Sequence, residues 1–494
     1  MPTKHSWPTN PKIYEINTWP WLTNLTDIYG QNIKLDSIPI ELIDQKLTLF
    51  DVVWLMGVWE RSPIGREIAM NHEGLQEEYR KALKYYNDQD VVGSPYSVYY
   101  YHVSSQLGGS DALKSFRADL KDRNLLLILD YVPNHVSIDH LWTLEKSDVF
   151  IKGTLEDLMF KPYDFFSVGG TVYAHGRDPN FPPWTDTVQI NAFSSEARSK
   201  AINTLLSIAQ QCDGVRCDMA MLMTNSVFSR TWKDKAGPAL EKEFWEEIIV
   251  AVKNKFPDFK FIAEVYWDME WELMQQGFDY CYDKKLYDRM LHENAETIRA
   301  HLHASWDYQQ KLIRFIENHD EQRAVIAFGK EKSKAAAILS LTLPGARLIH
   351  EGQMDGYKLK LPVQLGRRQS EEEDQEILEF YLQLLNSLPE KKMREEIWTM
   401  CKVDPTGDLS NTNLIAFVWQ FEENYLLIVI NFSPYLAKGN IIIGDLDYGS
   451  IKWSFTDLLT QKVFVYEGNH LDAHGLFVEL PAWNGHIFDL RKTD

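Results

Sequence analysis

The chain of 494 residues has little cysteine, an excess of negative over positive charge and no long apolar run. Its four cysteines, Cys212, Cys217, Cys281 and Cys401, form no CxxC pair, so the sequence indicates neither a disulfide framework nor a zinc site. The formal net charge of −20 disfavours nucleic acid or an anionic membrane as a partner, because both bind clustered Lys and Arg. No apolar stretch is long enough to span a bilayer, and no secretory signal is apparent. We therefore expect a cytoplasmic protein with reduced thiols, no membrane partner and no nucleic-acid partner.

Short apolar runs alternate with amphipathic segments over the first four-fifths of the sequence. The runs, at 13–18, 52–56, 125–130, 214–217, 261–263, 278–282, 312–316 and 346–349, are predicted strands. The segments at 111–122, 195–211, 241–253 and 331–341 have the apolar spacing of helices. Near-continuous apolar runs are typical of parallel strands that are buried on both faces. Eight such strands alternating with helices predict an α/β protein of the (β/α)8 TIM barrel class.

Two stretches depart from this alternation. Residues 136–191 are longer than an ordinary strand-to-helix loop and rich in Pro, Gly and aromatic residues, which predicts an inserted functional segment. After about residue 391, short alternating strands bounded by Asn, Gly and Asp predict an all-β sandwich. The expected organisation is a barrel formed by 1–135 and 192–391, an insertion at 136–191, and a C-terminal β-sandwich at 392–494.

Four short polar motifs each follow an apolar run. They are DYVPNH at 130–135, GVRCD at 214–218, FIAE at 261–264 and FIENHD at 315–320. A single Asp at the end of a strand is more often a helix cap or a loop residue than a catalytic group. In a (β/α)8 barrel, however, reactive groups lie at the carboxyl ends of several strands. Four motifs in register therefore predict an active site in which Asp218, Glu264 and Asp320 converge.

The residue types in these motifs fit the cleavage of a glycosidic bond. Retaining cleavage requires one ionised carboxylate as nucleophile and one protonated carboxyl group as acid. Arg216, two residues before Asp218, is expected to hold Asp218 ionised. Glu264 follows an apolar strand beside a second carboxylate, and both surroundings favour its protonated form. The sequence thus predicts opposite protonation states for the two groups.

In order and spacing, the four motifs resemble the four sequence regions of the alpha-amylase family of glycoside hydrolases, also called family 13. The resemblance implies a catalytic barrel, a domain B inserted after the third strand, and a C-terminal β-sandwich. It implies that Asp218 is the nucleophile, Glu264 the acid/base and Asp320 the carboxylate that stabilises the transition state. The substrate-binding residues implied by the same pattern are Tyr96, His135, Arg216 and His319, while Asp130 and Asn134 match its structural polar pair.

The chain departs from this pattern just after the nucleophile. Many amylases carry Lys and His three and four residues later, where they help to bind a sugar beyond the scissile bond and a calcium ion. Met221 and Leu222 stand there instead and supply neither a charge nor a strong hydrogen-bonding group, which puts an acceptor site of the usual design in doubt. Calcium needs about six to eight oxygen ligands, and no compact acidic loop is apparent. We expect no cofactor and no metal ligands, with calcium left open because Asn134 remains and the insertion has carboxylates.

Several functions are compatible with the motifs. The first is a retaining α-glycosidase that acts on oligosaccharides of the α-glucan type or on small α-glucosides. The second is an α-glucan transglycosylase or a maltosyltransferase-like enzyme, which uses the same intermediate but a sugar hydroxyl in place of water. GSPYSVYYY and NHVSIDHLW partly resemble that branch of the family. A non-catalytic carbohydrate-binding relative and a metal-dependent barrel enzyme are further alternatives, the latter disfavoured because Arg216 competes with a cation. The oligomeric state stays open.

Overall fold

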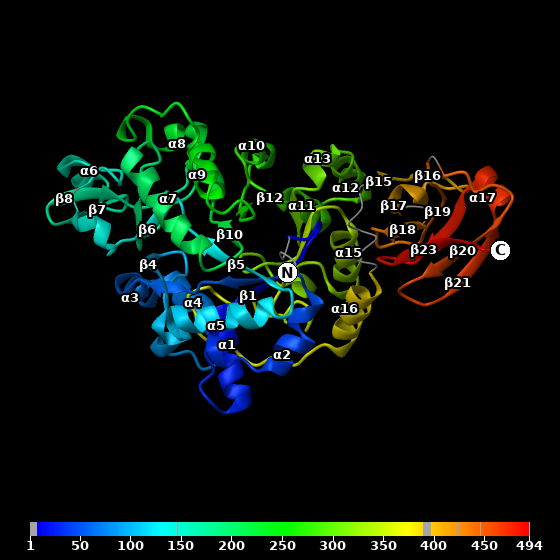
Figure 1. Cartoon of the computed structure of the whole chain (residues 1–494), viewed down its shortest axis with the longest axis horizontal. Helices are drawn as coiled ribbons and strands as arrows, with labels where there is room; N and C mark the ends of the chain where they lie inside the picture. Colours follow the sequence, from blue (N-terminus) through cyan, green and yellow to red (C-terminus); the bar gives the residue numbers. More distant parts are fainter. Residues whose placement is uncertain (1–6, 146, 389–396, 422–423, 445, 494) are drawn as a thin grey trace. The chain divides into compact units, whose positions relative to one another are not determined.

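The structure, a computed structural model, describes residues 7–145, 147–388, 397–421, 424–444 and 446–493. The chain folds into two compact units. The first consists mainly of Ile13–Tyr282 and Leu359–Ser370, and the second of Pro8–Lys12, Asp283–Lys358 and Glu371–Asp494. Figure 1 shows the course of the chain and labels its helices and strands.

Eight strands form a closed barrel in the order β1-β14-β13-β12-β11-β10-β5-β2. They are β1 (Lys12–Asn17), β2 (Val52–Met56), β5 (Leu126–Tyr131), β10 (Gly214–Cys217), β11 (Lys260–Ala263), β12 (Tyr280–Tyr282), β13 (Leu312–Arg314) and β14 (Ala346–His350). Neighbouring strands pair in parallel, as in β5 with β10 and β10 with β11. Each predicted apolar run forms one of these strands, so the TIM-barrel prediction is confirmed.

Helices follow most barrel strands. In the first unit they are α1 (Thr18–Tyr29), α2 (Ile40–Gln45), α3 (Pro63–Asn71), α4 (Glu73–Ala82), α5 (Gly109–Lys121), α6 (Leu155–Phe160), α7 (Ser195–Ala209), α8 (Asn225–Trp232), α9 (Phe244–Lys253) and α10 (Glu270–Gln275). In the second unit they are α11 (Lys284–His292), α12 (Ala295–Leu302), α13 (Trp306–Gln309), α14 (Ala324–Ala327), α15 (Lys330–Thr342), α16 (Gln375–Ser387) and α17 (Gly468–His474). In α7 the residues spaced by four, Ala197, Ala201 and Leu205, are all buried, which is the reason for its periodicity. In the described part of the chain, no helix combines the length and the apolar character needed to cross a membrane.

Small strands occupy the segment between β5 and α7. Strand β6 (His135–Ser137) pairs antiparallel with β9 (Thr187–Gln189), and the register sets His135 opposite Gln189. Strands β7 (Phe165–Val168) and β8 (Thr171–Ala174) form a hairpin between them. Earlier in the chain, β3 (Trp59–Arg61) pairs with β4 (Val98–Val103). The β6 and β9 pair therefore brings the two ends of the insertion together.

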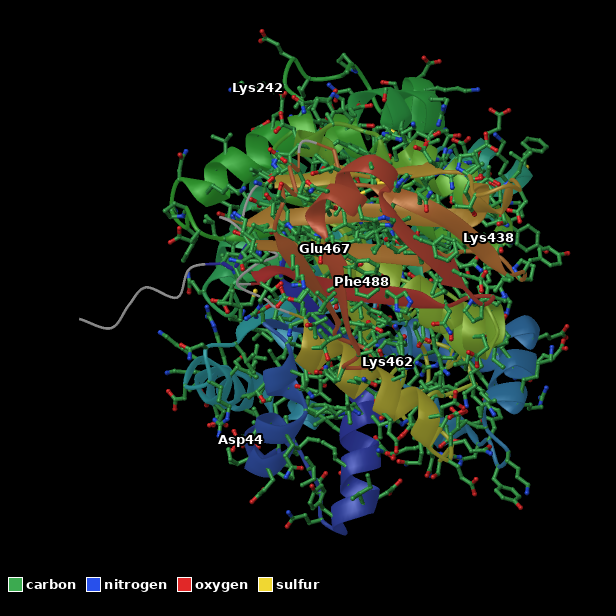
Figure 2. All side chains as sticks on the ribbon, turned by 90° about the vertical axis from the view of Figure 1, so that its right-hand side faces the viewer. Asp44, Lys242, Lys438, Lys462, Glu467 and Phe488 are labelled. Atoms are coloured by element: carbon green, nitrogen blue, oxygen red, sulfur yellow. The ribbon has the colours of Figure 1, made fainter. Side chains whose placement is uncertain are left out.

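The C-terminal part of the second unit contains two antiparallel sheets. One has the order β15-β17-β18-β23-β20-β21 and the other β16-β19-β22. Their strands are β15 (Ile397–Met400), β16 (Lys402–Asp404), β17 (Leu414–Phe421), β18 (Asn424–Asn431), β19 (Ala437–Ile442), β20 (Lys452–Asp457), β21 (Val463–Glu467), β22 (Leu476–Leu480) and β23 (Gly485–Thr493). Residues of both sheets, such as Leu427 and Ile441, share one buried core, so the predicted β-sandwich is present. Figure 2 labels Lys438 on β19 and Glu467 on β21.

The predicted boundary between residues 391 and 392 lies within 389–396, outside the described residues.

Candidate active site

Three adjacent parallel strands carry the first group of predicted site residues. Arg216 in β10 lies opposite Asp130 in β5 and Ile262 in β11. Just past the strands, the amide of Asp218 donates to Tyr131 O (2.9 Å) and that of Glu264 to Cys217 O (3.0 Å). The ladder therefore continues through both carboxylate-bearing residues and fixes them side by side at the carboxyl end of the barrel.

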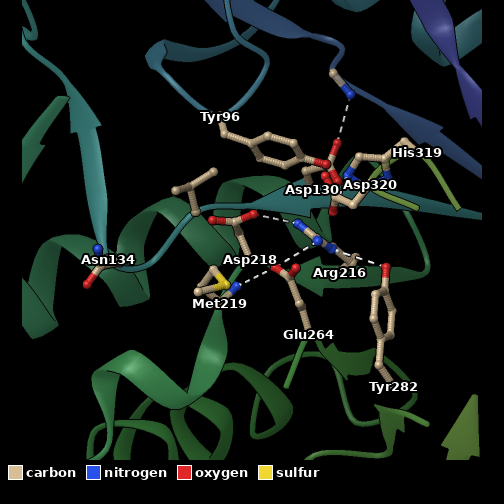
Figure 3. Close-up of polar contacts among 12 residues, drawn as sticks. Tyr96, Asp130, Asn134, Arg216, Asp218, Met219, Glu264, Tyr282, His319 and Asp320 are labelled. Atoms are coloured by element: carbon tan, nitrogen blue, oxygen red, sulfur yellow. Dashed lines mark hydrogen bonds and ion pairs between the residues drawn. The ribbon is translucent and has the colours of Figure 1, made fainter. Parts of the chain in front are cut away.

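Arg216 contacts both of these carboxylates. Its Nη1 lies 2.7 Å from Asp218 Oδ1 and its Nη2 lies 2.8 Å from Glu264 Oε2. Its Nε also donates to Tyr282 Oη at 3.3 Å. The Arg216 and Asp218 side chains are only 1% and 10% exposed, so little water screens their attraction. Figure 3 shows this cluster.

Burial alone lowers the pKa of Arg216, but attraction to Glu264 and Asp218 outweighs burial and raises the pKa well above its ordinary value. Arg216 is thus a permanent cation between the two carboxylates.

The two oxygens of Glu264 have further partners. Its Oε2 accepts a hydrogen bond from the amide of Met219 (2.7 Å), and its Oε1 accepts one from Tyr266 Oη (2.8 Å). Met219 directly follows Asp218 and has a φ of 41°, in the left-handed region that bulky residues rarely occupy. This conformation accompanies the amide contact with Glu264. Neither contact was predicted: the Met219 donor is a main-chain amide, which a residue type does not reveal, and Tyr266 lies outside the four motifs.

The segment after Asp218 is apolar and buried. Met221 and Leu222, at the two positions that depart from the family pattern, are 0% and 3% exposed. Trp245 Nε1 donates to the main-chain oxygen of Ala220 (2.8 Å), which fixes this short turn against the α9 helix. The turn therefore offers no charged side chain to a bound sugar.

Tyr96 and His135 belong to the same cluster. The Tyr96 ring centre lies 5.2 Å from the guanidinium carbon of Arg216, within the range of a cation–π contact. His135 is buried, hydrogen-bonds the backbone of Tyr96 and packs against the Trp184 ring at 5.1 Å. Burial lowers the pKa of His135 to about 4, so its imidazole is neutral near pH 7. The structure thus brings Tyr96, His135, Arg216, Asp218 and Glu264 together.

The Asp130 carboxylate is hydrogen-bonded by donors at the end of strand β2. Its Oδ1 accepts from Trp54 Nε1 (3.1 Å) and its Oδ2 from the amide of Gly57 (2.8 Å). Gly57 has a φ of 78°, and a Cβ there would lie only 2.9 Å from Arg61 and from Pro95. Asp130 therefore holds the β2 and β5 ends in place, in agreement with the structural role predicted for it.

The second unit carries His319 and Asp320 in the loop after β13. His319 Nε2 lies 3.0 Å from Asp320 Oδ2, and the two side chains are 1% and 42% exposed. Asn318 Oδ1 accepts from the amides of both Asp320 and Glu321 at 2.9 Å, which fixes the turn that presents Asp320. His319 and Asp320 are thus placed next to each other by local geometry.

A buried acidic residue secures the base of this loop. Glu317 Oε1 accepts from Arg323 Nη1 and lies 3.0 Å from His350 Nδ1, while Glu317 Oε2 accepts from the amide of Ala324 (2.7 Å). Burial raises the pKa of Glu317, but Arg323 and His350 outweigh burial and lower it overall. Glu317 and Arg323 flank His319 and Asp320 in sequence, so their ion pair closes the loop. Sequence reasoning missed this pair, although the polar Glu317 at the end of an apolar run was a visible signal.

The residues at Asn134 do not fit calcium. Gln189 Nε2 donates to both the side-chain and the main-chain oxygen of Asn134, each at 2.9 Å. Gln189 Oε1 accepts from Asn134 Nδ2 (3.3 Å) and from the amide of Arg177 (3.2 Å). An amide donor thus points at the oxygens that a cation would use, and Gln189 carries no negative charge. Among the residues described here, no group of three or more His, Cys, Asp or Glu side chains is arranged to hold a metal ion.

A closed parallel barrel with carboxylates at the ends of adjacent strands, bound by one buried arginine, is typical of a barrel glycosidase. The model of the family described as "Alpha amylase, catalytic domain" matches residues 87–398, more than half of the chain. The chain therefore belongs to the alpha-amylase family.

Two curated relatives are distant in sequence. The chain is 21% identical to "Alpha-amylase MalA" of Haloarcula japonica over 433 residues, which covers 85% of this chain and 56% of the relative. It is 22% identical to "Alpha-amylase 3" of Dictyoglomus thermophilum over 285 residues, which covers 52% of this chain and 53% of the relative. The chain spans about half the length of these curated relatives.

Solved structures with the same fold match almost the whole chain. The maltogenic alpha-amylase AmyB of Thermotoga neapolitana has a TM-score of 0.68 at 17% identity and covers 97% of this chain and 98% of its own. The alpha-amylase of H. orenii has a TM-score of 0.67 at 18% identity and covers 99% of this chain and 100% of its own. The alpha-amylase of Geobacillus thermoleovorans in complex with acarbose has a TM-score of 0.64 at 17% identity and covers 98% of this chain and 99% of its own. These likenesses establish the fold.

Proposed function

We propose that the chain is a retaining α-glycosidase that acts on α-glucans or α-glucosides through a covalent glycosyl-enzyme intermediate. The observation that carries this proposal is the ion pairing of Asp218 and Glu264 with a single buried Arg216. Asp218 is the proposed nucleophile and Glu264 the proposed acid/base. Asp320 is the proposed transition-state stabiliser by its place in the family pattern, after strand β13.

The proposed chemistry uses one ionised and one protonated carboxyl group. Arg216 keeps Asp218 ionised, so an Asp218 oxygen attacks the anomeric carbon while Glu264 gives its proton to the departing glycosidic oxygen. Water then attacks the glycosyl-enzyme, and Glu264 takes the proton from that water. Neutral His135 and Tyr96 are proposed to bind the reacting sugar, together with His319. His135 would meet the sugar as an uncharged imidazole near pH 7.

An oligosaccharide or a small α-glucoside is the proposed partner. The solved structure from Geobacillus thermoleovorans contains acarbose, which supports an oligosaccharide for this chain too. Other structural neighbours include a debranching enzyme and a cyclic α-maltosyl-(1→6)-maltose hydrolase, so the fold is compatible with several α-glucosides. All three predicted carboxylates are present, which argues against a non-catalytic relative.

A second candidate function is transfer to a sugar hydroxyl. Trp267, three residues after Glu264, is 40% exposed and lies 6.0 Å from the Arg230 guanidinium carbon. Its indole offers an exposed apolar surface close in sequence to Glu264, and the turn with Met221 and Leu222 supplies no charge. A flat apolar surface favours the binding of a pyranose over that of water, which supports α-glucan transglycosylase or maltosyltransferase-like activity.

We also propose the predicted organisation of barrel, domain B at 136–191 and C-terminal sandwich, and a cytoplasmic location. The four cysteines are free and buried, which supports a reducing compartment. No cofactor is proposed, and calcium is not proposed because Gln189 occupies the oxygens of Asn134.

The test is incubation with maltoheptaose, with and without inorganic phosphate, followed by mass analysis and by NMR of the first product. Shorter chains with an α-anomeric first product support retaining hydrolysis. Longer chains beside shorter ones support transfer, and a sugar phosphate supports the maltosyltransferase-like activity. A β-anomeric first product contradicts the retaining mechanism, and the Asp218→Asn variant serves as the inactive control.

A further inference from the structure

The two oxygens of Glu264 have chemically different partners. Oε2 faces Arg216 Nη2 at 2.8 Å and the amide of Met219 at 2.7 Å. Both partners only donate hydrogen bonds. Oε1 instead faces the hydroxyl of Tyr266 at 2.8 Å, and a hydroxyl can donate or accept. A proton on Oε2 would point at two donors, whereas Oε1 has a partner that can adapt to either protonation state.

From this difference we infer that Oε1 is the oxygen of Glu264 that carries the transferable proton, and that Tyr266 is the positioning residue that controls it. The inference rests on the proposed function of Glu264. When Glu264 is ionised, Tyr266 donates to Oε1 and stabilises the carboxylate. When Glu264 is protonated, the Tyr266 hydroxyl turns away from Oε1, which frees that proton for the substrate.

The backbone fixes Tyr266 in this place. Tyr266 follows Glu264 by two positions, and the single intervening residue, Val265, is fully buried. The next two residues, Trp267 and Asp268, have φ values of 65° and 59°. Consecutive left-handed residues other than glycine are uncommon and persist only where their surroundings enforce them. This turn ends the extended segment directly after Tyr266, so its ring is aimed back at Glu264.

The proton balance is simple. In the first step the Oε1 proton passes to the glycosidic oxygen as that oxygen leaves the anomeric carbon, and a bond forms between this carbon and Asp218. Tyr266 keeps its own proton and turns it toward the new carboxylate at Oε1. In the second step a proton of the attacking water returns to Oε1, and the bond to Asp218 breaks. Tyr266 therefore orients the acid/base without exchanging a proton.

The test compares two substrates in the Tyr266→Phe variant. Maltoheptaose has a poor leaving group that needs the proton of Glu264, whereas α-glucosyl fluoride needs far less acid assistance. We expect kcat/KM on maltoheptaose to fall about tenfold, because the acid is misoriented. On α-glucosyl fluoride we expect a change of less than about twofold. The ratio of the two rates within one preparation does not depend on the folded fraction of the variant.

The pH profile gives a second readout. Tyr266→Phe removes a hydrogen-bond donor to Oε1, so the basic limb of kcat/KM on maltoheptaose should move to higher pH. Tyr280→Phe is the matched control. The Tyr280 hydroxyl contacts Trp7 and not the carboxylates, so its removal should leave both the substrate ratio and the basic limb unchanged.

Two outcomes overturn the inference in distinguishable ways. If Tyr266→Phe lowers both rates equally and leaves the basic limb in place, Tyr266 has only a structural role. If Glu264→Gln turns over maltoheptaose as fast as the unaltered chain, Glu264 is not the acid/base, and the proposed function fails together with the inference.

Discussion

Two buried arginines organise the ends of the barrel strands in different ways. Arg216, in the first unit, binds Asp218 and Glu264, the two carboxylates proposed to react with substrate. Arg323, in the second unit, binds Glu317 and the main-chain oxygen of Glu351 (2.8 Å), neither of which is proposed to react. Both guanidinium groups are buried and paired with carboxylates, but only Arg216 touches the groups that are proposed to change charge during turnover.

The difference shows two uses of a buried cation. Arg216 acts electrostatically, because its charge lies within ion-pair distance of both carboxylates and favours the ionised form of each. Arg323 acts geometrically, because its pair with Glu317 closes the loop that carries Asp320. The Asp320 side chain is 42% exposed and the Asp218 side chain 10%, so Asp320 depends on its loop for its position. The two networks should therefore respond differently to mutation.

The largest effect on activity is expected from a change at Asp218, in the network of Arg216. Asp218→Asn keeps the shape of the side chain but removes the proposed nucleophile, so kcat should fall by about 10⁴-fold or more. The far-UV circular dichroism spectrum should be unchanged, because the strand ladder through residue 218 uses main-chain atoms. Steady-state kinetics on maltoheptaose measure the loss. A rate within tenfold of the unaltered chain would remove Asp218 from the nucleophile role.

A change in the network of Arg323 should lower the stability of the protein as well as its activity. Glu317→Gln leaves Arg323 buried without its carboxylate, which should cost about 3 to 5 kcal/mol of unfolding free energy. The loop then presents Asp320 less accurately, so kcat should fall by about 10²-fold with little change in the pH profile. Urea unfolding and pH-dependent kinetics measure the two effects.

Glu376→Gln is the control for this variant, because the Glu376 side chain is 59% exposed and its ion pairs with Lys330 and Lys334 should contribute little to stability. A Glu317→Gln variant of full stability would show that Arg323 is not structural. A shifted pH profile would show that the second network acts electrostatically, like the first.

A smaller effect is expected from His135, which is buried without a carboxylate in hydrogen-bond contact. Its folded-state pKa of about 4 lies below the ordinary 6.5, so the unfolded chain binds a proton more readily between these values. Stability should therefore fall as the pH drops from about 6.5 to 4, by about 3 kcal/mol for this group. His135→Gln should flatten that part of the stability curve, and the exposed His303→Gln should not. Equal slopes for both variants, measured by urea unfolding, would contradict the burial argument.

The smallest effect is expected from metal removal. EDTA should leave the melting temperature and the activity unchanged, because Gln189 donates to both oxygens of Asn134. Gln189→Ala should lower the unfolding free energy by about 2 kcal/mol, equally with and without added calcium. A large drop in melting temperature with EDTA, restored by calcium, would contradict this interpretation.

The sequence predicted the barrel strands well, because buried parallel strands are apolar throughout and so stand out as runs. It also predicted the pairing of Arg216 with Asp218, since residues two apart in a strand lie on the same face. The contacts of Gln189 with Asn134, and of Glu317 with His350, join segments far apart in the chain and leave no local pattern. The bond from Met219 to Glu264 uses a main-chain amide, which every residue except proline possesses.

That amide has a consequence for how this chain can change. Glu264 is held by the backbone of Met219 and not by its side chain, which is only half-buried. Substitutions that tolerate a φ of 41° can therefore change the side chain next to Asp218 without removing the amide contact to Glu264. Residue 219 is thus a position where the surface beside the two carboxylates can vary while the backbone that holds Glu264 stays the same.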